Sequence, residues 1–72
     1  MANEINGYVK TECNLRAGPS TYDKSRGKVG KNRRITALDI RSKKDWVLLR
    51  VEEGSHKGET GWIHRDCLHL DR

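Results

Sequence analysis

Short runs of apolar and β-branched residues, separated by turn-forming residues, follow one another along the whole chain. No segment shows the 3.6-residue periodicity of an amphipathic helix, so the pattern predicts an all-β fold. The expected strands cover residues 8–13, 28–29, 34–41, 46–51, 59–63 and 67–70. The expected connections are a turn at Gly18-Pro19, a loop over 20–30, turns at 30–32 and 42–45, a hairpin tip at 53–58 and a short helical turn at 64–66.

The run at residues 46–51 is apolar at nearly every position, so we expect a central strand there. Side chains alternate between the two faces of a strand, and the charge of Arg50 marks one face as the wetter side. The core face therefore carries Val47, Leu49 and Val51. Trp46 and Leu48 are left on the wetter face, where their presence needs another explanation.

The length of 72 residues corresponds to a single domain, which we assign to residues 8–70 after a short N-terminal tail at 1–7. At this size only about 60% of the surface of the unfolded chain is buried on folding, so the core is expected to be small. The first residues lack the basic start and apolar run of a signal peptide, and no apolar stretch approaches the roughly 20 residues that cross a bilayer. We expect a cytoplasmic monomer without membrane insertion, or a cell-wall location if the domain is released or belongs to a larger protein.

Positive charge is concentrated in one part of the chain. The net charge is +5, but residues 24–44 contain nine basic residues against Asp39 alone, a local balance of +8 that leaves −3 for the remainder. The candidate anion or nucleic-acid patch is Lys24, Arg26, Lys28, Lys31, Arg33 and Arg34. Such an asymmetry steers anionic partners toward one side of a small protein. The alternative is that these charges only keep the surface solvated.

A motif at the first turn resembles a known family. The sequence Asn-Leu-Arg-Ala-Gly-Pro-Ser at residues 14–20 resembles the opening signature of bacterial SH3-like (SH3b) domains. Trp46 at the start of a strand, Gly61-Trp62-Ile63, and the closing Asp66-Cys67-Leu68 resemble later segments of the same family. The resemblance covers about residues 8–70. It implies a small SH3-like barrel of five to six short, mostly antiparallel strands with a long RT-type loop, and it places Ile35 and Ala37 inward.

Three aromatic residues are candidates for ligand binding, because exposed aromatic rings give a large contact area at low entropic cost. If the barrel assembles as expected, Tyr22 in the long loop lies beside the strands that carry Trp46 and Trp62, forming a shallow groove. Asp23 and Asp45 could pair there with a ligand amine, and Arg16 with a carboxylate. The alternative interpretation is that the Trp residues only cover the core and Arg16 only pins its own loop.

Cys13 and Cys67 fall on strands expected to meet at the seam of the barrel. A disulfide there would stabilise the fold by about 4 kcal/mol in the chain-entropy model. Without a signal peptide, however, buried free thiols are the expected state. His64, Cys67 and His69 match no standard zinc spacing, so no metal site and no cofactor is expected.

Catalytic machinery is not evident in the sequence. A cysteine nucleophile needs an adjacent base and an exposed position, and no Ser/His/Asp arrangement or phosphate-binding glycine loop is present. We therefore expect a non-catalytic module that binds an extended peptide, a cell-wall (peptidoglycan) fragment or a protein partner through the aromatic groove. Two alternatives are a small basic barrel that binds nucleic acid through residues 24–44, and an intracellular adaptor or inhibitor protein.

Overall fold

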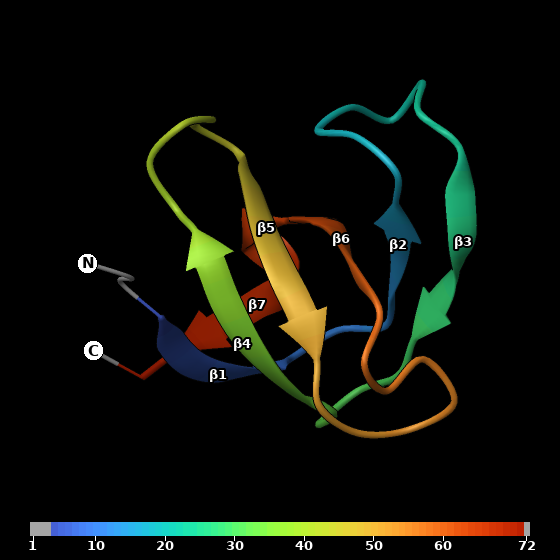
Figure 1. The fold of residues 1–72 in the computed structure, drawn as a ribbon, viewed down its shortest axis with the longest axis vertical. Coiled ribbons are helices and arrows are strands. Elements are labelled where there is room, and N and C mark those ends of the chain that lie inside the picture. Colours follow the sequence, from blue (N-terminus) through green and yellow to red (C-terminus); the bar gives the residue numbers. More distant parts are fainter. Residues whose placement is uncertain (1–3, 72) are drawn as a thin grey trace.

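Within residues 4–71, the part of the chain that the computed structural model describes, there are seven strands and one short 3-10 helix (Figure 1). They are β1 (Ile5–Val9), β2 (Cys13–Arg16), β3 (Ser25–Val29), β4 (Arg34–Asp39), β5 (Trp46–Val51), β6 (Thr60–His64), η1 (Arg65–Cys67) and β7 (Leu68–Leu70). The strands form one antiparallel sheet in the order β3-β2-β6-β5-β4-β1-β7. The predicted all-β, SH3-like fold is confirmed, with seven strands where five or six were expected.

The first expected strand is divided in two, so the prediction of one strand over residues 8–13 is wrong. The backbone N–H groups of Lys10 and Thr11 donate to the carbonyl of Cys67, which turns the chain between β1 and β2. β1 also begins earlier than expected, since Ile5 already pairs with Ala37. Residues 1–3 of the expected tail lie outside the described residues.

The closure of the barrel follows the prediction. β7 pairs with β1 in antiparallel register, with Leu68 opposite Val9 and Leu70 opposite Gly7. β1 in turn pairs with β4, so the two ends of the chain meet at one side of the sheet. Figure 1 shows β1 and β7 side by side.

Alternate positions on the strands supply the core. On β5 the expected core residues Val47, Leu49 and Val51 are fully buried, whereas Trp46 and Leu48 are half-buried on the opposite face. Ile35 and Ala37 also point inward, as the family resemblance implied. Among residues 4–71, the buried hydrophobic residues are Val9, Leu15, Val29, Ile35, Ala37, Val47, Leu49, Val51, Ile63 and Leu68.

A bulge in β4 explains why no alternation was visible there in the sequence. Ala37 lies opposite Leu49 and Asp39 opposite Leu48, so Leu38 is an extra residue in the ladder. Thr36, next to two buried neighbours, is itself 5% exposed. Its hydroxyl donates a 2.6 Å hydrogen bond to Glu52 Oε2, which satisfies the buried polar group.

The main loops lie at opposite ends of the barrel (Figure 1). The β2–β3 loop, residues 17–24, lies at the same end as the start of β5. The β5–β6 loop, residues 52–59, lies at the other end, near the end of β3. The turn expected at 30–32 is present, with Asn32 at φ 69°, a left-handed conformation that Asn tolerates better than most residues.

Candidate functional site

The outer surface of β5 and β6 carries four half-buried residues that we call the aromatic face: Trp46, Leu48, Trp62 and His64. The register places Trp46 opposite His64 and Leu48 opposite Trp62. The rings of Trp46 and His64 meet edge to face, with centroids 5.2 Å apart and an interplanar angle of 73°. The aromatic face therefore consists of two cross-strand pairs, of which Trp46 and His64 pack ring against ring, and each side chain keeps part of its surface in solvent.

The β2–β3 loop is tied to this face through Arg16. Arg16 is the residue of β2 that pairs with Trp62 of β6, and its Nη1 donates a 3.0 Å hydrogen bond to the carbonyl of Asp23. The N–H of Ala17 also donates to the carbonyl of Lys24 across the base of the loop, at 2.9 Å. Arg16 thus pins its own loop, one of the two roles considered for it.

Tyr22 occupies the tip of that loop with 97% of its surface exposed. Its backbone N–H donates to Ser20 Oγ at 3.0 Å, and the next N–H, that of Asp23, donates to the Ser20 carbonyl at 3.1 Å. Ser20, the polar residue after Gly18-Pro19, therefore holds the backbone of the loop in one conformation. Tyr22 is presented to solvent from an ordered backbone.

The two aspartates considered as ligands for an amine have different surroundings. The Asp23 carboxylate lies against Gly18, in the space that a side chain at that position would fill. Asp45 is exposed, and its carbonyl accepts a 2.8 Å hydrogen bond from the Arg65 N–H. Both lie next to an aromatic residue of the candidate site, Asp23 after Tyr22 and Asp45 before Trp46.

The basic residues of the candidate patch are spread over one edge strand and the turn that follows it. Alternate positions on and before β3 expose Lys24, Arg26 and Lys28. Arg26 also donates to the carbonyl of Thr60 on β6. Lys31 and Arg33 are exposed in the turn, and Arg34 lies 3.7 Å from the carboxylate of Asp71.

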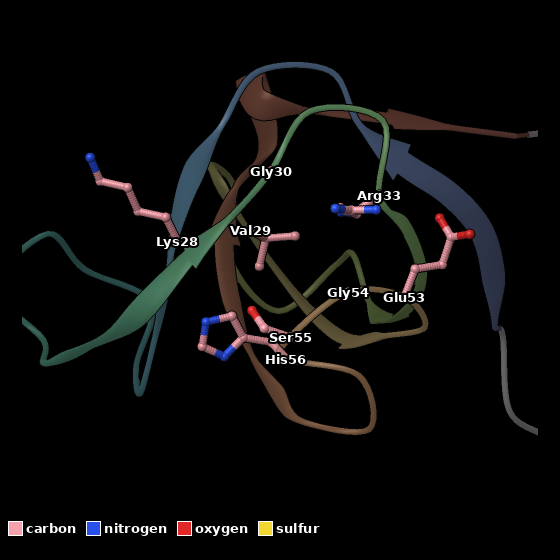
Figure 2. Close-up of a pocket in the computed structure, with 8 residues that line it drawn as sticks. All are labelled: Lys28, Val29, Gly30, Arg33, Glu53, Gly54, Ser55 and His56. Carbon is pink, nitrogen blue, oxygen red and sulfur yellow. The ribbon is translucent and has the colours of Figure 1, made fainter.

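A hollow of about 110 Å³ lies at the end of the barrel away from the start of β5, between the end of β3 and the β5–β6 loop (Figure 2). We call it the hairpin hollow; it is lined by Lys28, Val29, Gly30, Arg33, Glu53, Gly54, Ser55 and His56. The sequence pattern predicts only a hairpin tip at residues 53–58 and indicates no connection between that tip and Arg33. The only sequence signal for the hollow is the pair of glycines at 30 and 54, because a glycine leaves space beside a turn that a side chain would otherwise fill.

Cys13 and Cys67 are free thiols whose side chains meet, although they lie on β2 and η1 rather than on two paired strands. Burial, together with the hydrogen bond that the protonated Cys67 thiol donates to Cys13, raises the pKa of the Cys67 thiol to about 12. A thiol with so high a pKa is a poor nucleophile at neutral pH. This environment is that of a structural thiol rather than a reactive one.

The histidines near Cys67 take part in ring packing. His69 stacks on Tyr8, with ring centroids 4.9 Å apart, and His64 packs on Trp46 as described above. Within residues 4–71, no group of three or more His, Cys, Asp or Glu side chains is placed to hold a metal ion. No helix in that part of the chain is both long and apolar enough to cross a membrane.

Comparison with known families identifies the domain. The model of the bacterial SH3 domain family matches residues 7–69, nearly the whole chain. The chain belongs to the bacterial SH3 domain family. Members of this family are typically non-catalytic binding modules, so the expected general class is supported, while the partner of this SH3 domain is not identified by the match.

A solved structure supports the fold of this SH3 domain. The structure of NlpC2 from Trichomonas vaginalis superimposes with a TM-score of 0.79 and 24% sequence identity, over 94% of this chain and 23% of that chain. At this identity the similarity shows the fold alone, and this SH3 domain spans less than a quarter of the length of that protein. The search of curated proteins finds no match.

Proposed function

We propose that this SH3 domain is a non-catalytic module that binds an extended peptide, in a cell wall or in a protein partner, across the aromatic face and Tyr22. One observation carries the proposal: Tyr22 is 97% exposed in a loop that several hydrogen bonds hold in place. A large ring in solvent contributes nothing to the core. Its fixed backbone lowers the entropy lost when a ligand covers it.

The position of Tyr22 relative to the tryptophans supports a shared surface. Trp62 pairs with Arg16, Arg16 donates to the carbonyl of Asp23, and Tyr22 precedes Asp23 in the chain. The start of β5, with Trp46, lies at the same end of the barrel (Figure 1). Aromatic anchors surrounded by polar residues are the usual composition of a binding hot spot.

The charges next to the aromatic residues favour a peptide over a nucleic acid. Asp23 and Asp45 adjoin Tyr22 and Trp46, and their carboxylates would repel phosphate groups while attracting an amine. Two cations of the basic segment are engaged within the domain, Arg26 with Thr60 and Arg34 with Asp71. The nucleic-acid alternative keeps the other exposed cations of the segment: Lys24, Lys28, Lys31 and Arg33 on and around β3, and Arg41, Lys43 and Lys44 in the loop before β5.

Sedimentation with purified peptidoglycan and titration with an array of extended peptides test the proposal. We expect one of these to bind the wild-type domain, and Tyr22→Ala to weaken that binding about tenfold or more with the thermal midpoint unchanged. Tyr8→Ala is the matched control, because Tyr8 stacks on His69 on β7, away from the aromatic face. Equal losses in both variants would contradict the proposal.

The same samples test the nucleic-acid alternative. Binding of single-stranded or duplex oligonucleotides that falls steeply with salt would favour the basic segment, because phosphate contacts release counterions. Peptide binding on aromatic side chains is expected to depend weakly on salt. A steep salt dependence together with an unaffected Tyr22→Ala variant would replace the peptide proposal.

A further inference from the structure

The hairpin hollow contains a cation without a partner. Within residues 4–71, the guanidinium of Arg33 forms no hydrogen bond and no ion pair. Arg33 lines the hollow, and Figure 2 draws its side chain between those of Val29 and Glu53. Its side chain lies beside Gly54, where an added Cβ would be 3.2 Å from Arg33 Nε. The position of Arg33 therefore depends on the absence of a side chain at residue 54.

Three residues that line the same hollow, Gly54, Ser55 and His56, carry further donors. Gly54 has φ +86°, and the turn it begins is closed by a hydrogen bond from the Lys57 N–H to the Gly54 carbonyl, at 3.2 Å. Within the described part of the chain, the N–H groups of Gly54, Ser55 and His56 donate to no acceptor. Consecutive free N–H groups in a turn with a left-handed residue form an anion-binding concavity. The Ser55 hydroxyl is a further donor in the lining.

We propose that the hairpin hollow binds the free carboxylate of a peptide C-terminus, held by the guanidinium of Arg33 and by donors of residues 54–56. A planar guanidinium matches a carboxylate with two parallel hydrogen bonds. The volume of about 110 Å³ is several times the roughly 10–15 Å³ that one water molecule needs on the same measure, so the hollow has room for one carboxylate with a small terminal residue.

Glu53 explains why the ligand is a peptide terminus rather than a phosphate. Its Oε1 accepts a 2.8 Å hydrogen bond from the Arg34 N–H, and its carboxylate lines the hollow. Lys28 also lines the hollow, but Figure 2 shows its amine pointing away from Arg33. The negative charge of Glu53 beside the single guanidinium disfavours a doubly charged anion. The second oxygen of Glu53 can accept the N–H of the terminal peptide residue, a group that free phosphate and acetate lack.

This site does not rest on the function proposed for the aromatic face. The β5–β6 loop, which supplies half of the lining of the hollow, lies at the end of the barrel opposite the start of β5 (Figure 1), and the hollow shares no residue with the aromatic face. The test therefore uses a small probe that does not reach the aromatic residues. Failure of one proposal leaves the other in place.

Backbone amide shifts of the whole domain, measured by NMR at constant ionic strength, test the site with N-acetylglycine as the probe. We expect saturable shifts at residues 30 and 54–56, weaker binding of acetate, and no shifts with N-acetylglycinamide, which lacks the charge. Shifts with N-acetylglycinamide equal to those with N-acetylglycine, or tighter binding of inorganic phosphate than of N-acetylglycine, would overturn the assignment.

Two arginine variants separate a site from a general effect of charge. Arg33→Gln should weaken N-acetylglycine binding about tenfold or more. Arg33→Lys should restore only part of it, since lysine lacks the planar fork. Arg41→Gln removes the same charge from an exposed loop at the other end of the barrel and should change binding less than about twofold. Equal effects of Arg33→Gln and Arg41→Gln would contradict the proposal.

Discussion

The side chain of Leu15 packs directly on the backbone of Gly61: a Cβ atom at residue 61 would lie 2.8 Å from Leu15 Cδ1 and 2.8 Å from the carbonyl oxygen of Arg16. This contact lies where β2 meets β6, next to the pairing of Arg16 with Trp62. It joins the arm formed by β2 and β3 to the rest of the sheet. The aromatic face and the β2–β3 loop depend on it for their relative position.

Gly61→Ala is therefore expected to destabilise the domain. The added methyl group meets a backbone oxygen, which cannot move aside as a flexible side chain can, so we expect a loss of about 1–3 kcal/mol in the free energy of unfolding. Gly30→Ala is the matched control, because the nearest atoms to its Cβ are 3.9 Å away. Urea denaturation of both variants measures the difference; equal stabilities would contradict the packing described.

Arg16 is expected to act as a positioning residue for Tyr22. Arg16→Met keeps most of the side-chain length and removes the hydrogen bond to Asp23, so the loop should loosen and stability should fall by about 1–3 kcal/mol. Faster hydrogen exchange at the Ala17 and Asp23 amides is the specific readout. Arg41→Met provides the control, and unchanged exchange in Arg16→Met would show that the loop is held without this bond.

Much of the fold could be predicted from the pattern of apolar and polar residues within each strand. The two-residue alternation in 46–51 identified the buried face of β5, and Leu15 and Ile63 are both fully buried, as a compact barrel requires. The break between β1 and β2 could not be predicted, because the partner of Lys10 and Thr11 is the carbonyl of Cys67, near the other end of the chain. Local propensity contains no information about such a partner.

The candidate site was less accessible to sequence reasoning. Aromatic residues of interest could be identified by type, yet whether Arg16 faces a ligand or its own loop depends on the geometry of Asp23. The hairpin hollow was missed because it combines Arg33 with residues 53–56, which are separated by the whole of β4 and β5. Only the folded chain brings those residues together.

The raised pKa of the Cys67 thiol leads us to expect a loss of stability at high pH. Its pKa is raised to about 12 in the folded domain, whereas an unfolded cysteine titrates at about 8.5. The folded state therefore binds the thiol proton more tightly than the unfolded state does. The stability that this difference contributes is fully present below the pKa of the unfolded cysteine and declines as the pH rises toward the pKa of the folded state. Between about pH 8 and about pH 11, the thermal midpoint of unfolding should decrease more steeply with pH for the wild type than for Cys67→Ala. Parallel curves would contradict this environment.

Glu52 predicts a sensitivity to acid. Hydrogen bonds from Thr36 and Arg50 hold the pKa of the Glu52 carboxyl below its usual value. The stability from these bonds is present above the usual pKa of a glutamate and is lost as pH falls through the lowered value. Glu52→Gln should reduce the loss of stability between neutral and acidic pH in urea denaturation. Glu12→Gln, at an exposed position, should leave that loss unchanged.

The most direct measurement of the peptide-binding proposal is an NMR titration of the domain with a peptide or soluble peptidoglycan fragment found to bind it, following the indole N–H signals of Trp46 and Trp62. These two signals, together with the backbone amide of Tyr22, should shift with one common dissociation constant, while the amides of Lys28 and Lys31, on the basic edge formed by β3 and the turn after it, change little. Shifts confined to the basic edge, with both indole signals unmoved, would contradict the assignment of the ligand to the aromatic face.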